Sequence, residues 1–117
     1  MTFFSLLQEL FGLGDFNRER LGGAMRSPMW NEVRRDYMIL HPDCEACGRK
    51  NSRLSPLQVH HCEPFHIKPE LELDPRNLIT LCGDCHLILG HLRSFKSFNK
   101  DIRADAKVLL EKIKARP

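Results

Sequence analysis

Cysteines and histidines supply most of the chemistry available to this chain of 117 residues. Four of the five cysteines form two Cys-x-x-Cys pairs with 34 residues between them: Cys44 with Cys47, and Cys82 with Cys85. Each pair can present two thiolates to one tetrahedral ion, and four thiolates favour zinc. Gly48 and Gly83 stand where a tight knuckle turn would need glycine. The alternatives are a redox-active cysteine pair and an iron–sulfur cluster.

The fifth cysteine, Cys62, follows a pair of adjacent histidines and is better explained by packing than by ligation. Five of the six histidines lie between residues 60 and 91: His60, His61, His66, His86 and His91. Successive side chains of a strand point to opposite faces, so the two adjacent rings can do different work. Because His86 directly follows a predicted zinc ligand, the zinc site would fix one wall of a second site.

A helix and a ββα unit are predicted to position these residues. Ser27-Pro28 can start a helix whose apolar face carries Trp30, Val33, Tyr37 and Leu40, and His41-Pro42 ends it. Residues 57–61 alternate as a strand, residues 77–81 form a second candidate strand, and residues 83–91 open a short helix. A last helix, capped by Asn99, has one apolar face: Ile102, Ala106, Leu109, Leu110 and Ile113.

The first 24 residues read as an amphipathic segment and linker, with the remaining 25–117 as one domain. Such a helix could contact the core, a second copy of the protein, another protein or a membrane surface. It lacks a basic leader and Glu9 interrupts it, so we expect neither a signal peptide nor a transmembrane segment. The five cysteines then suit metal binding in a reducing, intracellular compartment, and a cytoplasmic location is expected.

Charge is unevenly distributed, although the net charge is only +3. Residues 91–117 carry eight Lys or Arg against three acids, whereas residues 54–90 carry two against five. This asymmetry suits a polyanion held by the C-terminal part, and the alternative is a solvated lysine-rich helix. Four side chains near the histidines are candidate phosphate contacts: Lys68, Arg76, Arg93 and Lys96.

The ordered motifs "CEACG", "VHHCEPFH", "DPRNLITLC" and "CGDCHLILGH" resemble the HNH endonuclease family, in its variant with a four-cysteine zinc site. The resemblance covers roughly residues 27–99. It implies an α+β fold: a small ββα-metal (His-Me finger) core braced by the four-cysteine zinc site, with flanking N- and C-terminal helices. It also implies hydrolysis of DNA phosphodiester bonds that leaves 5′-phosphate and 3′-hydroxyl ends, in a phage, mobile-element or restriction setting.

The resemblance also implies roles for single residues. His60 and His86 would bind a catalytic divalent ion, His61 would be the general base, and Asn77 would orient the base or its loop. We expect magnesium or manganese at that ion site, although imidazole ligands also suit nickel, cobalt or zinc.

The remaining two histidines, His91 and His66, each have more than one possible role. His91 lies five residues after His86, where an α-helix favours four, so it is a third ligand, a phosphate contact or a helix cap. His66 contacts substrate or, as we prefer, holds its loop in place. The alternative for the whole chain is a non-catalytic, zinc-stabilised nucleic-acid-binding module.

Overall fold

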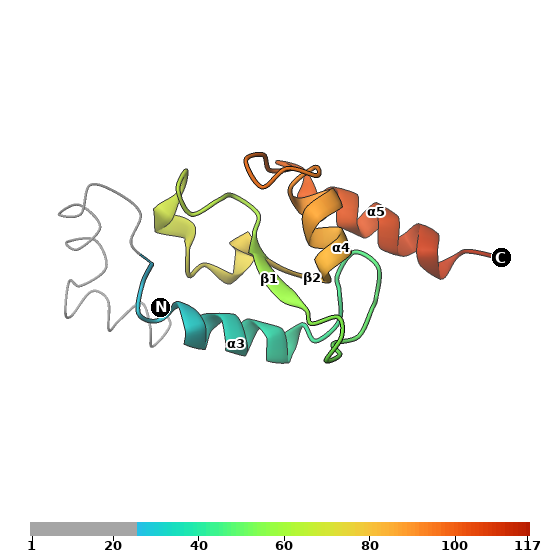
Figure 1. Ribbon diagram of the computed structural model, residues 1–117, viewed down its shortest axis with the longest axis horizontal. Helices are drawn as coiled ribbons and strands as arrows, with labels where there is room; N and C mark the ends of the chain where they lie inside the picture. Colours follow the sequence, from blue (N-terminus) through green and yellow to red (C-terminus); the bar gives the residue numbers. More distant parts are fainter. Residues whose placement is uncertain (1–25) are drawn as a thin grey trace.

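The computed structural model of the protein describes residues 26–117, so the predicted amphipathic segment at residues 1–24 lies outside the described part (Figure 1). The fold is α+β, as predicted. Its elements, in chain order, are α3 (Trp30–Leu40), β1 (Gln58–His61), η1 (Pro69–Leu71), η2 (Pro75–Asn77), β2 (Leu78–Leu81), α4 (Gly83–Cys85), the π-helical η3 (His86–Gly90) and α5 (Ile102–Lys114).

Helix α3 begins two residues later than Pro28, where the sequence predicts its first position. The Ser27 hydroxyl oxygen accepts a hydrogen bond from the Met29 N–H at 3.1 Å, so the serine closes the turn that leads into the helix. Val33 and Tyr37 are buried as expected. Leu40 is 77% exposed, contrary to expectation, because the apolar cluster that α3 joins ends at Tyr37.

Strands β1 and β2 form an antiparallel pair in which His60 lies opposite Ile79 and His61 lies opposite Leu78. Opposite residues share a face of the sheet, so the two histidines point to different faces. On the His61 face, Leu78 packs with Val33 and Tyr37 of helix α3. The sheet is therefore covered on that face by α3, which runs beneath it in Figure 1.

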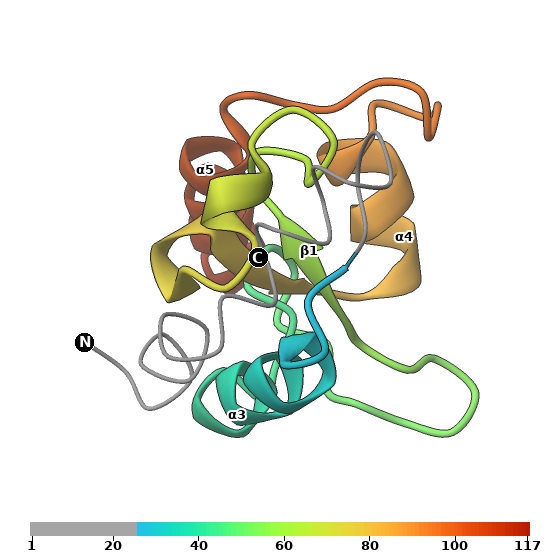
Figure 2. The ribbon, with the colours of Figure 1, turned by 90° about the vertical axis from the view of Figure 1, so that its left-hand side faces the viewer.

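The His60 face carries the second apolar cluster. Ile79 and Leu81 pack there with Ile102 and Ala106 of helix α5. Asn99 binds the start of α5 with both ends of its amide: its Oδ1 accepts from the Asp101 N–H, and its Nδ2 donates to Asp105. Figure 2 shows β1 between α3 on one side and α4 with α5 on the other.

Candidate metal centre and active site

The four cysteines of the Cys-x-x-Cys pairs converge, with their Sγ atoms all within 4.8 Å of one another. Cys47 Sγ and Cys82 Sγ are 3.7 Å apart. A tetrahedral zinc with bonds of about 2.3 Å holds its sulfurs about 3.8 Å apart, so the donor set fits zinc. A hydrogen bond from Cys85 lowers the pKa of the Cys44 thiol to about 4 and raises the pKa of Cys85. The contact therefore favours the thiolate form of Cys44, which is the form that binds a metal ion.

The two glycines next to the cysteine pairs, Gly48 and Gly83, differ in backbone conformation. Gly48 has φ +82°, in the left-handed region, and its N–H donates to the Cys44 carbonyl oxygen at 2.8 Å. A side chain is disfavoured there, as the sequence predicts for a tight turn. Gly83 begins α4 without a positive φ, and a Cβ built on it meets nothing within 4 Å. The expected turn requirement at Gly83 is therefore wrong.

His61 is buried at the end of β1 and held in one tautomer. Its Nε2 lies 2.9 Å from the carbonyl oxygen of Glu72. A carbonyl only accepts, so Nε2 carries the hydrogen and Nδ1 keeps a lone pair. The ring also packs against Trp30, with centroids 4.4 Å apart. Contacts from two different segments thus fix the orientation of an imidazole that can accept a proton at Nδ1.

Arg26 and Glu72 complete the surroundings of His61, and sequence analysis identified neither. Arg26 Nη1 lies 3.4 Å from His61 Nδ1 and 3.7 Å from a carboxylate oxygen of Glu72. The Glu72 side chain is buried and accepts the Ser27 N–H at 3.1 Å. The Arg26 guanidinium also lies over the Phe65 ring, 4.6 Å from its centroid. A cation is thereby placed beside the lone pair of His61.

Asn77, predicted to orient the base or its loop, contacts the loop. Its Oδ1 accepts the Glu63 N–H at 2.8 Å, and its Nδ2 donates to the carbonyl oxygens of Glu63 and Leu71 at 3.1 and 3.3 Å. These bonds hold together the two ends of the segment that runs from β1 to η1. Since Glu72 directly follows Leu71, the amide positions the carbonyl that holds His61.

Three further histidines converge on the other face of the sheet. The ring centroids of His60, His86 and His91 are 4.8 to 5.0 Å apart in pairs, and one nitrogen from each lies within 4.8 Å of the others. His91 Nδ1 lies 2.8 Å from the Ser97 carbonyl oxygen and so carries its hydrogen, which leaves Nε2 as an acceptor. That Nε2 lies 3.2 Å from His86 Nε2.

This donor set fits a divalent cation. His60 Nε2 is buried and has no hydrogen-bond partner, which is a costly arrangement that a metal ion would relieve. Two imidazole nitrogens on one tetrahedral zinc ion, at bonds of about 2.0–2.1 Å, lie about 3.3 Å apart, close to the His86–His91 separation. The three rings therefore suit one cation that keeps further coordination positions open.

The position of His91 follows from the π-helical turn η3. The His91 N–H donates to the His86 carbonyl oxygen, five residues earlier, at 3.0 Å. A π-helical turn is wider than an α-helical one, so it returns the chain to the same side after five residues. This widened turn brings together two histidines that regular α-helical spacing would separate.

Burial favours the neutral form of three histidines: His60, His61 and His86. It lowers the pKa of His60 to about 3, aided by the neighbouring histidines, and lowers the pKa of His86. Burial also lowers the pKa of His61 to about 4; the Glu72 carbonyl opposes this shift and the charge of Arg26 adds to it. Neutral imidazole is the form that binds metal and the form that accepts a proton.

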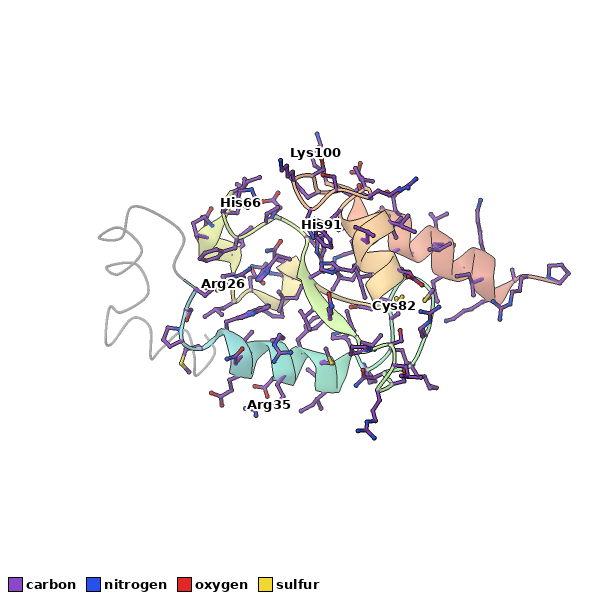
Figure 3. The ribbon with its side chains drawn as sticks, in the orientation of Figure 1. Arg26, Arg35, His66, Cys82, His91 and Lys100 are labelled. Atoms are coloured by element: carbon purple, nitrogen blue, oxygen red, sulfur yellow. The ribbon has the colours of Figure 1, made fainter. Side chains whose placement is uncertain are left out.

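Both groups of histidines open into one hollow of about 310 Å³. Arg26, His66 and Lys96 line it together with the three converging imidazole rings. Figure 3 shows Arg26, His66 and His91 turned toward this region, with Cys82 at the opposite end of the α4 segment. The hollow is therefore a cationic and imidazole-rich depression beside a cysteine-braced scaffold.

The other predicted contacts lie outside the lining of this hollow. Lys68 and Arg93 are exposed. Arg76 makes two hydrogen bonds with Asp74, at 2.9 and 3.1 Å, so its charge is already paired. Cys62 is half-buried against the apolar cluster of α5, in agreement with a packing role.

Comparison with known proteins identifies the central segment. Residues 44–92 match the family model described as HNH endonuclease, so this segment is similar to an HNH endonuclease domain. A nuclease-type activity on a nucleic-acid substrate follows from that family. No curated protein and no solved structure matches the chain. Within residues 26–117, no helix is long and apolar enough to cross a membrane.

Proposed function

We propose that the protein is a metal-dependent DNA endonuclease in which His61 is the general base. The supporting observation is that neutral His61, whose Nδ1 lone pair is contacted only by Arg26 at 3.4 Å among the described residues, and the three converging imidazoles line the same hollow. One side of that hollow can activate a nucleophile, and the other can hold a cation against the same phosphate. DNA is the proposed substrate among the nucleic acids that the family implies.

The proton transfer follows from the tautomer of His61. Its Nδ1 accepts a proton from a water molecule while Nε2–H remains bonded to the Glu72 carbonyl oxygen. The water oxygen forms a bond to phosphorus as the bond from phosphorus to the 3′ oxygen breaks, and the 3′ oxygen takes a proton from solvent. The products are a 5′-phosphate and a 3′-hydroxyl. General-base assistance of this kind contributes about 10²- to 10⁴-fold.

His60 and His86 are the proposed ligands of the catalytic ion, with His91 as a third. When bound, a divalent cation there would neutralise charge on the scissile phosphate and on the departing oxygen. Manganese or magnesium is the proposed ion in the cell, and nickel, cobalt or zinc suit imidazole ligands at least as well. Arg26 adds positive charge at the base, where the phosphate would bind.

Relaxation of supercoiled plasmid tests this proposal. Zinc-loaded wild-type protein, His61→Ala and His41→Ala are incubated with plasmid over a titration of Mg²⁺ and Mn²⁺. His41 is an exposed residue at the end of α3 and is the matched control. We expect nicking that requires the added ion in the wild type and in His41→Ala, and a loss of about 100-fold or more in His61→Ala.

Circular dichroism and zinc content show whether the variants are folded, and His61→Gln keeps more of the side-chain volume if the alanine variant unfolds. Equal cutting by wild type and a folded His61 variant would refute the assignment of the base. If folded wild-type protein binds DNA but cuts under neither ion, a non-catalytic binding module is the better description.

A further inference from the structure

A phenylalanine ring stands exposed beside the candidate metal ligands. Phe95 is 67% exposed, although it is one of the larger apolar side chains of the protein. Its ring centroid lies 4.8 Å from that of His91 and 5.8 Å from that of His86, at interplanar angles of 52° and 65°. Neither contact is a parallel stack, so the histidines hold the ring without covering it face to face.

The segment that carries Phe95 is ordered by hydrogen bonds at several points. The Ser97 carbonyl oxygen accepts from His91 Nδ1 at 2.8 Å, and the Ser97 N–H donates to the Ser94 carbonyl oxygen at 2.8 Å. The Asn99 N–H donates to the Gly90 carbonyl oxygen at 2.9 Å, which closes the segment at its base. A ring presented this way is already positioned for a ligand, so binding orders little further.

The turn that leads to Phe95 is strained. Leu92 and Arg93 have φ of 53° and 69°, although neither is glycine. Non-glycine residues in this region are unfavourable and persist where the surrounding structure holds them in place. These two left-handed residues turn the chain between His91 and Phe95, whose rings lie side by side with centroids 4.8 Å apart.

The charge around Phe95 is positive. From His91 to Phe98 the sequence contains Arg93 and Lys96 and no acid. Lys96 and Phe98 line the same hollow as Phe95, and Arg26 lines it from the other side. An aromatic face with adjacent cations is the combination that binds nucleic-acid strands whose bases are unstacked, because the ring stacks on a base while the cations contact phosphates.

We propose that Phe95 is a stacking platform for an unpaired nucleobase next to the scissile phosphate, so that the protein favours DNA with a locally unpaired strand. This inference deepens the proposed function and rests on it for the identity of the substrate. A base inside a regular duplex has both faces covered by its neighbours and cannot stack on Phe95. An unpaired base can stack without that obstacle, while its phosphate lies beside the imidazoles.

Equilibrium binding tests the platform separately from catalysis. Fluorescence anisotropy with zinc-loaded protein, without added divalent ion, compares three labelled probes: a single-stranded oligonucleotide, its duplex, and the same duplex with a short mismatched bubble. The variants are Phe95→Ala, Phe95→Tyr and Val108→Ala. Val108 is 51% exposed on α5 and controls for the loss of an exposed apolar side chain.

We expect Phe95→Ala to weaken binding of the single strand and the bubble by roughly 5- to 150-fold, and binding of the duplex by less than about 3-fold. Phe95→Tyr retains a stacking face and should bind like the wild type, as should Val108→Ala. Equal weakening on all three probes, or no weakening on any, would overturn the proposal. So would a Phe95→Tyr variant that binds as poorly as Phe95→Ala.

Cleavage of the same bubble and duplex with Mn²⁺ separates this inference from the function on which it rests. If the wild type cuts both probes at equal rates and Phe95→Ala does the same, the platform is refuted while the endonuclease stands. If the binding differences appear but no probe is cut, the platform for unpaired bases stands and the catalytic proposal fails.

Discussion

His60 and His61 are neighbours in the chain but belong to different environments. The ring of His60 faces η3, where its buried Nε2 joins two other imidazoles. The ring of His61 faces α3, between Trp30 and the Glu72 carbonyl oxygen. One strand end thus presents two imidazoles to two different environments, because adjacent side chains leave it in opposite directions.

The pH dependence of cleavage follows from the surroundings of His61. As a base it acts only when neutral, and burial lowers its pKa from the usual 6.5 to about 4. A cation on the neighbouring ligands shifts this pKa in the same downward direction. We therefore expect kcat/KM, at saturating metal, to stay constant as the pH falls through 6.5 and to decline only in the region of about pH 4–5, close to that pKa.

Arg26→Ala provides the control for this profile. The charge of Arg26 contributes to the lowered pKa of His61, so its removal should move the acid limb to higher pH. The measurement is kcat/KM on one oligonucleotide across pH, with circular dichroism at each point. Half-maximal activity at pH 6.5 or above in folded wild-type protein would contradict a buried base, because 6.5 is the ordinary pKa of histidine.

The residues that sequence analysis predicted and those that it missed differ in one respect. His60, His61, Asn77 and His86 lie within motifs, where type and spacing are readable. Arg26 and Glu72 act through a contact made in the folded chain, and the related Ser27–Glu72 hydrogen bond joins residues 45 positions apart. Nothing in the sequence near Arg26 indicates that its partner is a carboxylate buried after η1.

Among the secondary-structure elements, too, some could be predicted from the sequence pattern and others could not. The alternation of residues 57–61 and the apolar run of residues 77–81 predict two strands. Alternation is typical of a strand with one polar face, and a short continuous apolar run is consistent with a strand that is buried on both faces, as β2 is. The turn after Cys85 is π-helical: its hydrogen bond joins residues five apart in the sequence, whereas an α-helical hydrogen bond joins residues four apart. Side-chain periodicity over five residues cannot resolve that difference, so the sequence alone does not decide whether His91 is a third ligand.

Gly90, in the π-helical turn, allows His60 to approach the other two rings. A Cβ at Gly90 would lie 3.3 Å from His60 Cε1 and 3.4 Å from His60 Nε2, and His60 is only 4% exposed. The ring has little room to move away, so Gly90→Ala should displace the nitrogen that faces the cation. We expect divalent-ion affinity to fall by about 10-fold, the lower range for perturbed metal sites, as measured by calorimetric titration with Mn²⁺.

Gly83→Ala is the matched control, because a Cβ there meets nothing within 4 Å and alanine favours a helix. It should leave ion affinity unchanged and leave the melting temperature equal or higher. If Gly90→Ala binds Mn²⁺ as tightly as Gly83→Ala does, close approach at Gly90 has no part in assembling the three histidines.

At the scale of the whole molecule, the cysteine cluster joins the segment that follows α3 to the segment that follows β2. Cys44 follows helix α3 and Cys82 follows strand β2, and both are buried in the apolar cluster that includes Ile102 of α5. The sheet of the described residues has only two strands, and an isolated two-stranded hairpin is marginally stable in water. The packing of both faces of the hairpin therefore depends on the link between the two cysteine pairs.

Removal of zinc should unfold the protein. Structural zinc binds thiolate sites with an apparent free energy of about 10–16 kcal/mol at pH 7, which matches or exceeds the whole stability of a typical domain, about 5–15 kcal/mol. Cys82→Ser changes one buried ligand with almost no change in volume. We expect that variant, and wild-type protein treated with a strong chelator, to lose cooperative thermal unfolding and the zinc counted by mass spectrometry.

His91→Ala separates the two metal sites, because His91 belongs to the three-histidine group and not to the cysteine cluster. It should keep one zinc per chain and a cooperative melt, while its binding of added Mn²⁺ weakens. A Cys82→Ser protein that still melts cooperatively without zinc would show that the two apolar clusters are sufficient for folding. We expect Cys82→Ser to lose the cooperative melt and His91→Ala to keep it. That difference requires a cysteine site whose metal stabilises the fold and a separate histidine site, around His60, that forms only after the chain has folded.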